Sequence, residues 1–365
     1  MGPMGDVRHL YVHVPFCAHR CGYCDFTTVT SHDERRAAYV DALLGELAAR
    51  GGCLADPVET VYLGGGTPSR LGPELLGELL DRLPRAQAET TVECNPEDVT
   101  DDLARALAAR GCRVSLGAQT FAPALLDVLE RRTTPAGVRD AVGRLRAAGV
   151  ASISLDLIFG IPGETTDDLE GDLDALIALA PDHVSAYELE AKPGTRFTVH
   201  HGAALAAQAD RVEDHLDRVV DRLGAAGYDW YEVASFARGP GQRAVHNTAY
   251  WRGRDYLGLG IGAVSTVAGE RRANGPKLAA YLDDPAGAPC ALEAIDAETA
   301  ARERLMLGLR LAEGVALDGE LADLVDEAGV ARLVAAGVAR REGGTLRLER
   351  RGRMLLHDCV AEILR

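Results

Sequence analysis

Short runs rich in β-branched and aromatic residues alternate with amphipathic helical stretches over the first two thirds of the chain. Runs of the first kind predict β-strands, and apolar positions spaced three and four residues apart predict helices. The predicted strands cover residues 9–16, 59–63, 90–94, 113–118, 152–158, 183–189 and 229–236. Between them, helical periodicity is clearest over residues 34–50, 73–83, 100–110 and 166–179.

The repeated order of strand, helix and strand predicts an α/β fold with a parallel sheet, because right-handed helical crossovers join consecutive parallel strands. Six or seven such units form a complete or partial TIM-like barrel. In barrels of this kind the functional groups lie at the carboxyl ends of the strands. We therefore expect chemistry in the loops that follow the predicted strands.

The chain changes character after the seventh predicted strand. Residues 239–269 are rich in glycine and aromatic residues, which indicates a loop rather than a regular element. From about residue 297 helical periodicity returns, and it ends with a strand pair near residues 343–354 (GGTLRLERRGRM). We predict a barrel over residues 1–237, a connecting segment over 238–294, and a small helical, winged C-terminal domain over 295–365.

Composition and charge limit the compartment and the partners that we expect for this protein. Eight cysteines in a chain of 365 residues, with no charged and apolar leader before them, predict a cytoplasmic protein with reduced thiols. No run of about eighteen apolar residues is present, so we expect no membrane-spanning helix. The net charge of −16 disfavours a broad contact with a nucleic-acid backbone, and nucleic acid is not an expected partner.

Three cysteines lie close together in the segment VPFCAHRCGYCDF (residues 14–26), directly after the first predicted strand. Cys17, Cys21 and Cys24 have the spacing CxxxCxxC, and Phe26 stands where a fourth cysteine would complete a set of four. The three residues could be plain thiols in a turn, or zinc ligands completed by a flanking histidine. Three clustered thiolates also suit an iron-sulfur cluster with one iron left open. Structural zinc sites usually pair two CxxC segments, and the lack of a second pair favours the cluster.

Glycines and polar residues follow the next strands. The segment LGGGTPS (residues 63–69) brings Gly65, Gly66 and Thr67 to a strand end, where the backbone can approach a ligand closely. The same segment also suits a tight strand-to-helix turn. Glu93 ends the third predicted strand, where it could hold a ligand or form a salt bridge at the rim. Asp156 lies inside an otherwise apolar strand, which indicates a role in holding polar ligand groups.

The cysteine loop, with Tyr23 before its last cysteine, resembles the signature of the radical S-adenosylmethionine (SAM) superfamily. The resemblance implies a 4Fe-4S cluster held by the three cysteines, whose open iron is chelated by SAM. The segments YLGGGTPS, VECNPED, SLGAQTF and SLDLIFGIPGET resemble the branch that contains the oxygen-independent coproporphyrinogen III oxidase HemN and the heme chaperone HemW. This resemblance covers nearly the whole chain.

The same resemblance implies which residues contact SAM. The glycine-rich segment matches the motif that receives the amino group of SAM. The full implied set is Tyr11, Tyr23, Gly65, Gly66, Thr67, Glu93, Gln119, Arg131 and Asp156. The last three match positions that hold a second SAM molecule in the oxidase.

Three features bear on the choice between oxidase and chaperone. Oxidases typically have a cysteine where this chain has Phe26, and a long extension before the first strand, where this chain has few residues. The segment HNTAYW (residues 246–251) resembles a signature of the chaperones and implies heme contacts at His246, Asn247, Tyr250 and Trp251. Imidazole is a common ligand of heme iron, and aromatic rings pack well on porphyrin faces. The alternative is a structural loop in which His246 bonds to backbone.

Two functions follow from the resemblance. The first is a heme chaperone that passes heme to an acceptor hemoprotein, such as a respiratory cytochrome, with transient association with a membrane. The second is a radical SAM enzyme that acts on a porphyrinogen, or a related methyltransferase. The HNTAYW segment and Phe26 favour the chaperone.

Overall fold

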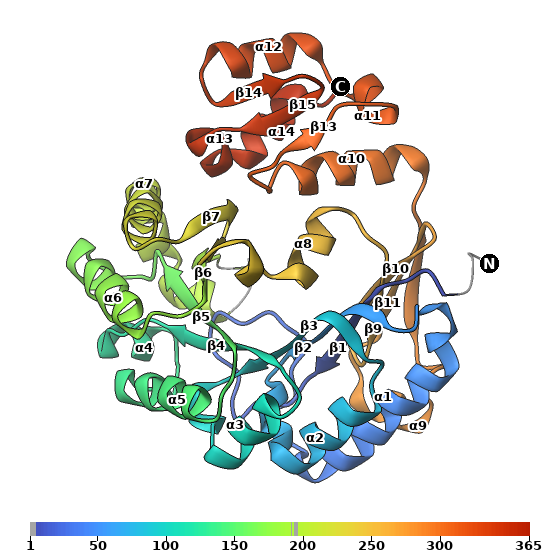
Figure 1. The fold of residues 1–365 in the computed structure, drawn as a ribbon. Helices are drawn as coiled ribbons and strands as arrows, with labels where there is room; N and C mark the ends of the chain where they lie inside the picture. The colour runs from blue at the N-terminus through green and yellow to red at the C-terminus, as the bar shows by residue number, and fades with distance from the viewer. Residues whose placement is uncertain (1–4, 191, 193–195) are drawn as a thin grey trace.

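The structure is a computed structural model, and it describes residues 5–190, 192 and 196–365. In this part of the chain, one curved sheet of twelve strands has the order β12-β11-β10-β9-β1-β2-β3-β4-β5-β6-β8-β7 (Figure 1). Its strands β1 to β6 run parallel and in chain order. They are His9–Val14, Val58–Gly65, Ala86–Cys94, Arg113–Gln119, Ser152–Phe159 and His183–Glu188. The predicted α/β class is confirmed, and because the sheet has two edges, at β12 and β7, the barrel is partial.

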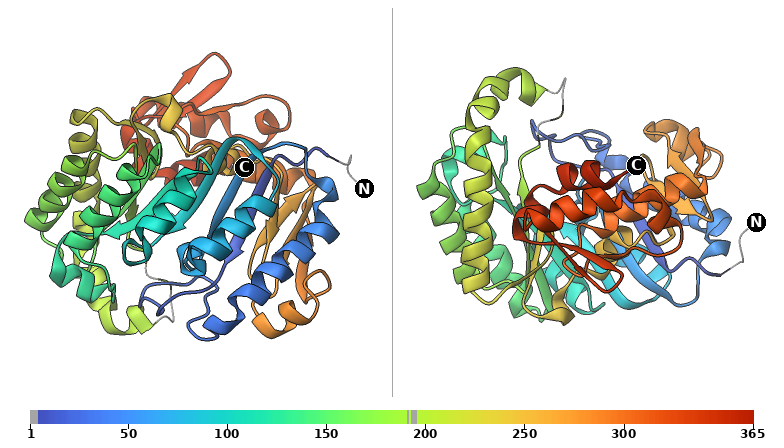
Figure 2. Two further views of the ribbon diagram at one scale, coloured as in Figure 1. Left: turned by 60° about the horizontal axis from the view of Figure 1, so that its bottom comes forward. Right: turned by 90° about the horizontal axis from the view of Figure 1, so that it is seen from above.

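Each parallel strand has an apolar face and a polar face. In β1, Leu10, Val12 and Val14 are fully buried in the core beneath the helices. The alternate residues His9 and Tyr11 take the opposite, inner face of the curve, because successive side chains of a strand point to opposite sides. The helices cover the outer face of the sheet (Figure 2). The inner face is therefore free to line a cavity.

The helices begin and end where local chemistry allows. The helices on the outer face are α1 (Arg36–Arg50), α2 (Gly72–Arg82), α3 (Asp101–Ala108), α4 (Pro123–Val128), α5 (Pro135–Ala147), α6 (Thr166–Leu179) and α7 (Arg196–Ala225). Helix α6 starts with a capping box, in which Thr165 Oγ1 accepts from the Asp168 amide at 3.2 Å and the Asp168 carboxylate accepts from the Thr165 amide at 2.9 Å. The predicted ranges for α1, α2, α3 and α6 agree with these bounds to within two residues.

Helix α7 is 30 residues long and was not among the predicted helices. At its start, Arg196 forms an ion pair with Glu130, and the Phe197 ring packs edge-on against Tyr23, with 6.3 Å between ring centroids. Near its end, Asp217 and Asp221 each pair with Arg350 at 2.5 Å. One helix thus connects the cysteine loop with the C-terminal domain.

The segment 239–269 is not the loop that its composition indicates. It contains α8 (Val245–Trp251), β9 (Tyr256–Leu259) and β10 (Val264–Val267), and β11 (Glu270–Asn274) and β12 (Cys290–Ala294) extend the same sheet. The glycines have a packing role, since a Cβ atom at Gly258 would lie 2.1 Å from the carbonyl oxygen of Val264. The predicted strand 229–236 is likewise two short antiparallel strands, β7 (Asp229–Glu232) and β8 (Ser235–Ala237).

The buried carboxylate of Glu46 on α1 fixes this segment to the barrel. Glu46 is 0% exposed and accepts hydrogen bonds from the Gly260 amide at 2.8 Å, Asn274 Nδ2 at 2.8 Å and the Tyr281 hydroxyl at 2.7 Å. It also pairs with Arg50 at 2.5 Å. Tyr281 lies on α9 (Leu278–Asp283). Glu46 thus joins three separate parts of the chain at one charged group.

The C-terminal domain has a core of its own and lies beyond α8 (Figure 1). Its elements are α10 (Ala297–Gly308), β13 (Val315–Ala316), α11 (Glu320–Leu324), α12 (Glu327–Ala335), β14 (Ala339–Glu342), β15 (Thr345–Leu348), α13 (Arg350–Met354) and α14 (Leu356–Ile363). The strands β14 and β15 form the predicted hairpin, whereas the residues RRGRM after it are helical. Among all described residues, no helix is long and apolar enough to cross a membrane.

We predict that Glu46→Ala lowers the free energy of unfolding by about 3–5 kcal/mol, because it leaves a buried charged and hydrogen-bonded group without its partner. Chemical denaturation measures this change. Glu78→Ala is the matched control, since Glu78 pairs with Arg82 at 3.3 Å on an exposed helix face and should cost at most about 1 kcal/mol. Equal effects of the two substitutions would contradict the role of Glu46.

Candidate functional site

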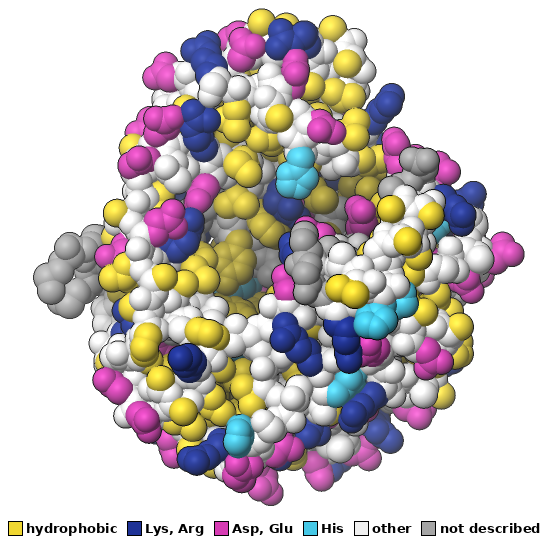
Figure 3. Space-filling model, turned by 180° about the vertical axis from the view of Figure 1, so that it is seen from behind, with side chains coloured by type: hydrophobic (Ala, Val, Ile, Leu, Met, Phe, Trp, Pro, Cys, Tyr) yellow, Lys and Arg dark blue, Asp and Glu magenta, His cyan; other side chains and the backbone are white. Residues whose placement is uncertain are grey.

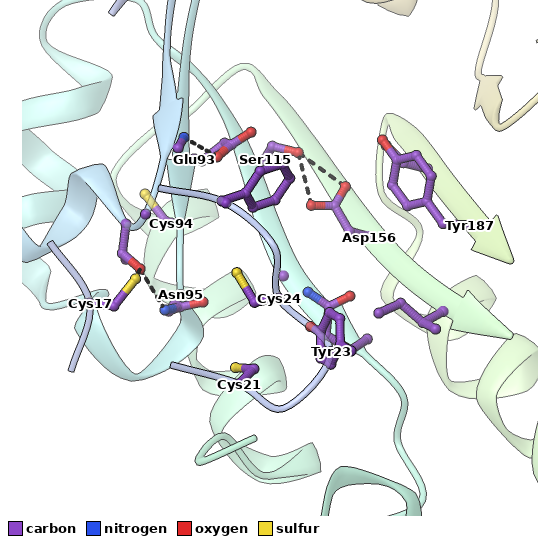
Figure 4. Close-up of a pocket in the computed structure, with 18 of the residues that line it drawn as sticks. Cys17, Cys21, Tyr23, Cys24, Glu93, Cys94, Asn95, Ser115, Asp156 and Tyr187 are labelled. Atoms are coloured by element: carbon purple, nitrogen blue, oxygen red, sulfur yellow. Dashed lines mark hydrogen bonds between the residues drawn. The ribbon is translucent and has the colours of Figure 1, made fainter. Parts of the chain in front are cut away.

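A cavity of about 370 Å³ lies at the carboxyl ends of the parallel strands. The three cysteines of the loop line one end of it, and Asp156 and Tyr187 lie on strands at the other side (Figure 4). The face opposite to that of Figure 1 is hollowed between the C-terminal domain and the barrel, and hydrophobic side chains gather there (Figure 3). The cavity is thus where the strand order predicted chemistry.

The cysteine loop is anchored at its base to the segment that follows it. The Cys17 amide donates to the Val29 carbonyl at 2.9 Å, and the Val29 amide donates to the Pro15 carbonyl at 2.8 Å. Cys17 Sγ lies 3.5 Å from Thr67 Oγ1, and Cys21 Sγ lies 3.8 Å from an Arg131 nitrogen. Burial raises the pKa of the Cys17 thiol to about 11, so a bound metal would displace its proton.

These residues fit an iron-sulfur cluster with one iron left open. All three cysteines come from one loop and line the same cavity. Arg131 Nε is also buried in this wall without a hydrogen-bond partner, which leaves it available to a ligand.

The two histidines that could complete a zinc site, His13 and His19, both bond to backbone carbonyls. His13 Nε2 bonds to the Thr27 carbonyl at 2.8 Å, and its Nδ1 lies 3.1 Å from the Tyr11 hydroxyl. His19 Nε2 bonds to the Glu130 carbonyl at 2.5 Å and lies 3.8 Å from Cys21 Sγ. Phe26, at the position of the missing fourth cysteine, is 62% exposed and lines the cavity.

The glycine-rich segment holds the carboxylate of Glu93 at the edge of the cavity. The Gly65 amide donates to Glu93 Oε2 at 3.2 Å, and the Tyr62 hydroxyl donates to Oε1 at 2.6 Å. A Cβ atom at Gly65, whose φ is +111°, would lie 2.5 Å from the His13 ring, and one at Gly66 would lie 2.4 Å from the Pro15 carbonyl oxygen. These glycines therefore serve close packing of the protein as well as access for a ligand.

Burial changes the charge state of both acidic groups in the wall. Burial and the nearby Asp156 raise the pKa of Glu93 to about 7, against the opposing effect of its hydrogen bonds. Burial likewise raises the pKa of Asp156 to about 6, although Ser115 Oγ lies 3.1 Å from Asp156 Oδ1. A cationic ligand group would restore the charged form of either carboxyl.

Gln119 and Arg131, both named from the sequence, also line the cavity. Gln119 follows a bulge in β4 and has a φ of 67°, an unusual conformation for a residue other than glycine. Arg131 donates to the Gly117 carbonyl at 3.1 Å and to Asn95 Oδ1 at 2.8 Å. Asn95 in turn donates to Thr67 Oγ1 at 3.1 Å (Figure 4).

Sequence reasoning missed Asn95, Tyr62 and Ser115, which hold the predicted residues in place. Asn95 follows Glu93 and Cys94 at a strand end, so its position was a usable signal. Tyr62 and Ser115 stand at alternate positions of β2 and β4, on the inner face. The alternation of apolar and polar residues within these strands was the signal for both.

The predicted heme residues lie on α8, which packs on the inner face of the sheet, and the structure does not bring all four together. Asn247 lines the cavity, whereas Trp251 faces the C-terminal domain, with the Arg310 guanidinium 4.1 Å from its ring centroid. His246 is 1% exposed, and its Nδ1 and Nε2 bond to Thr60 Oγ1 at 2.7 Å and the Tyr250 hydroxyl at 2.9 Å. Burial lowers the pKa of His246 to about 3, so its ring is neutral.

Comparisons with known proteins agree on the family. Residues 11–176 match the Radical SAM superfamily model, and residues 295–355 match the HemN C-terminal domain. The heme chaperone HemW of Mycobacterium tuberculosis is 39% identical over 100% of this chain and 97% of its own length. HemW of Lactococcus lactis is 34% identical over 84% of this chain and 83% of its own. The structure of coproporphyrinogen III oxidase HemN from Escherichia coli superposes with a TM-score of 0.80 and 23% identity, covering 98% of this chain and 90% of that one.

We predict that Cys17→Ala, Cys21→Ala and Cys24→Ala each abolish assembly of a 4Fe-4S cluster, because all three thiolates are needed to hold three of the four irons. Iron and sulfide analysis of anaerobically reconstituted protein, with its visible absorbance, measures the loss. Cys290→Ala is the control, since this half-buried cysteine lies on β12 outside the cavity. A full complement of iron and sulfide in any of the three variants would rule out that ligand.

We further predict that SAM affinity falls as the pH drops below 7, because the Glu93 carboxyl, with a raised pKa of about 7, must be ionised to accept an ammonium group. The fall should approach about tenfold per pH unit once the pH is well below that pKa. Calorimetric titration of the reconstituted protein measures it, with cluster absorbance recorded at each pH. Glu93→Gln should bind weakly and with little pH dependence above pH 6, where Asp156, with a raised pKa of about 6, is mostly ionised; a flat profile in the unchanged protein would contradict the assignment.

Proposed function

Because this chain belongs to the radical SAM superfamily and, within it, to the family of the heme chaperone HemW, we propose that it binds heme and passes it to an acceptor hemoprotein. The observation that carries the proposal is similarity to a heme chaperone at 39% identity over 97% of that protein's length. The likeness to HemN has 23% identity and supports the fold alone. The chaperone is therefore preferred over the porphyrinogen-directed enzyme or methyltransferase.

The cofactors are a 4Fe-4S cluster and SAM, as in the superfamily. When bound, they supply one-electron chemistry at the open iron. We propose that Cys17, Cys21 and Cys24 hold the cluster and that Glu93 receives the ammonium group of SAM. The other proposed SAM contacts are Tyr11, Tyr23, Gly65, Gly66, Thr67, Gln119, Arg131 and Asp156.

The support for these SAM contacts differs from residue to residue. Gly65, Gly66, Thr67, Gln119, Arg131 and Asp156 line the cavity directly, as does Tyr23. Tyr11 is set one layer back, where its ring stacks on Tyr62 with 6.2 Å between centroids. We therefore assign Tyr11 an indirect part in the site.

Heme contacts are proposed on α8. Asn247 lines the cavity, so it is the proposed heme residue that a porphyrin bound there would contact directly. His246 is the proposed iron ligand, with Tyr250 and Trp251 as ring contacts. Because both nitrogens of His246 are hydrogen-bonded and its ring is 1% exposed, ligation of iron requires one of these bonds to break and the ring to become accessible.

The acceptor is a hemoprotein, and we propose that it is a respiratory cytochrome met at a membrane surface. A net charge of −16 disfavours lasting adsorption to anionic lipids, which supports a transient contact made through the acceptor itself. The proposed compartment is the cytoplasm, where thiols remain reduced.

Heme titration of the reconstituted protein tests this function. We expect saturable binding, and a loss of affinity of at least about tenfold in His246→Ala with the cluster retained. His357→Ala is the control, because His357 is exposed on α14 of the C-terminal domain and does not line the cavity.

The same samples should be assayed for 5′-deoxyadenosine and for decarboxylated coproporphyrinogen. Heme binding with little turnover of porphyrinogen supports the chaperone. Efficient decarboxylation, or unchanged heme affinity in His246→Ala, would overturn the function or the ligand respectively.

A further inference from the structure

Two layers of side chains are stacked inside the partial barrel. The strand register places His9 beside Thr60 and Thr60 beside Glu89, and, one step nearer the carboxyl ends, Tyr11 beside Tyr62. Helix α8 lies against the first layer, since the Glu89 carboxylate accepts from the Val245 amide at 2.8 Å. Glu89 and Glu93 are four residues apart on β3, so one strand holds both α8 and the proposed SAM carboxylate.

His246 contacts both layers, through Thr60 in the first and Tyr62 in the second. The Thr60 hydroxyl lies 2.7 Å from His246 Nδ1 and 2.9 Å from His9 Nδ1, so it bridges the two rings. The His246 ring stacks on Tyr62, with 5.0 Å between centroids and 24° between planes. Tyr62 in turn donates to Glu93 at 2.6 Å.

We propose that His246 is a positioning residue of the SAM site: its ring supports Tyr62, whose hydroxyl holds the Glu93 carboxylate toward the cavity. The segment HNTAYW therefore serves the SAM site from within the barrel. Hydrogen bonds to a charged group are stronger than those between neutral groups, so loss of the Tyr62 orientation weakens the grip on Glu93.

The proposed function, on which this step rests, makes His246 a ligand of heme iron, and that role competes with its contact with Tyr62. The His246 ring is 1% exposed where it stacks on Tyr62, so a porphyrin can reach it only after the ring leaves this place. Capture of heme iron by His246 therefore removes the support from Tyr62. Heme bound at His246 and SAM bound at Glu93 oppose each other, and the opposition is reciprocal.

The positioning role is tested without heme, by SAM titration of three reconstituted variants and one control variant. His246→Ala, which removes the ring, should weaken SAM binding about fivefold to tenfold. His246→Phe, which keeps a ring against Tyr62, should restore affinity to within about twofold of the unchanged protein. Tyr62→Phe should weaken binding as His246→Ala does, and the control Tyr228→Phe, which loses a remote hydroxyl bond to the Pro181 carbonyl at 2.7 Å, should not. Cluster absorbance must be equal in all samples. Unchanged SAM affinity in His246→Ala overturns the positioning role.

The opposition is tested by repeating the SAM titration with heme bound. We expect the SAM dissociation constant of the unchanged protein to rise about fivefold or more, and that of His246→Phe to be the same with and without heme. An equal SAM affinity with and without saturating heme in the unchanged protein overturns the opposition. If the unchanged protein binds no heme, the proposed function fails, and the heme-free titrations still decide the positioning role.

Discussion

The two-faced character of the parallel strands is the constraint on which the site depends. Alternate residues of a strand point to opposite sides of the sheet, so β1 buries Leu10 and Val12 under the helices and turns His9 and Tyr11 inward. A closed barrel of this type fills its interior with branched apolar side chains. Here the interior carries hydroxyl, imidazole and carboxyl groups, and most of them have partners on neighbouring strands. Because a buried polar group without a partner is costly, the inner network and the cavity depend on each other.

Much of this arrangement was readable from the sequence, because it rests on local patterns. Strand periodicity located β1 to β6, and the rule that function lies at carboxyl ends placed the cysteine loop, Glu93 and Asp156 at one cavity. Family motifs added the identity of the cofactors. The confirmed parts are those in which a short run of residues suffices to define the element.

What the sequence did not predict depends on contacts between distant residues. The β9–β10 hairpin was hidden by its glycines, which are required because Gly258 lies against the backbone of Val264. The orientation of α8 could also not be predicted from the local sequence. The motif HNTAYW indicates a ligand, but only the packing against Thr60 and Tyr62 shows that His246 points into the barrel. The local preferences of residues for helix or strand do not predict where two backbones approach closely. They also do not predict which face of a short helix packs against the sheet.

Helix α7 connects the cysteine loop directly with the C-terminal domain. A helix of 30 residues is a rod of about 45 Å, and its two ends are bonded to different parts of the molecule. One end touches Tyr23 of the cysteine loop, and the other pairs with Arg350 of the C-terminal domain. A displacement of the C-terminal domain by a docked protein would therefore be passed along α7 to the loop that carries the metal ligands. Docking of another protein and the geometry of the cluster ligands are in this way mechanically coupled.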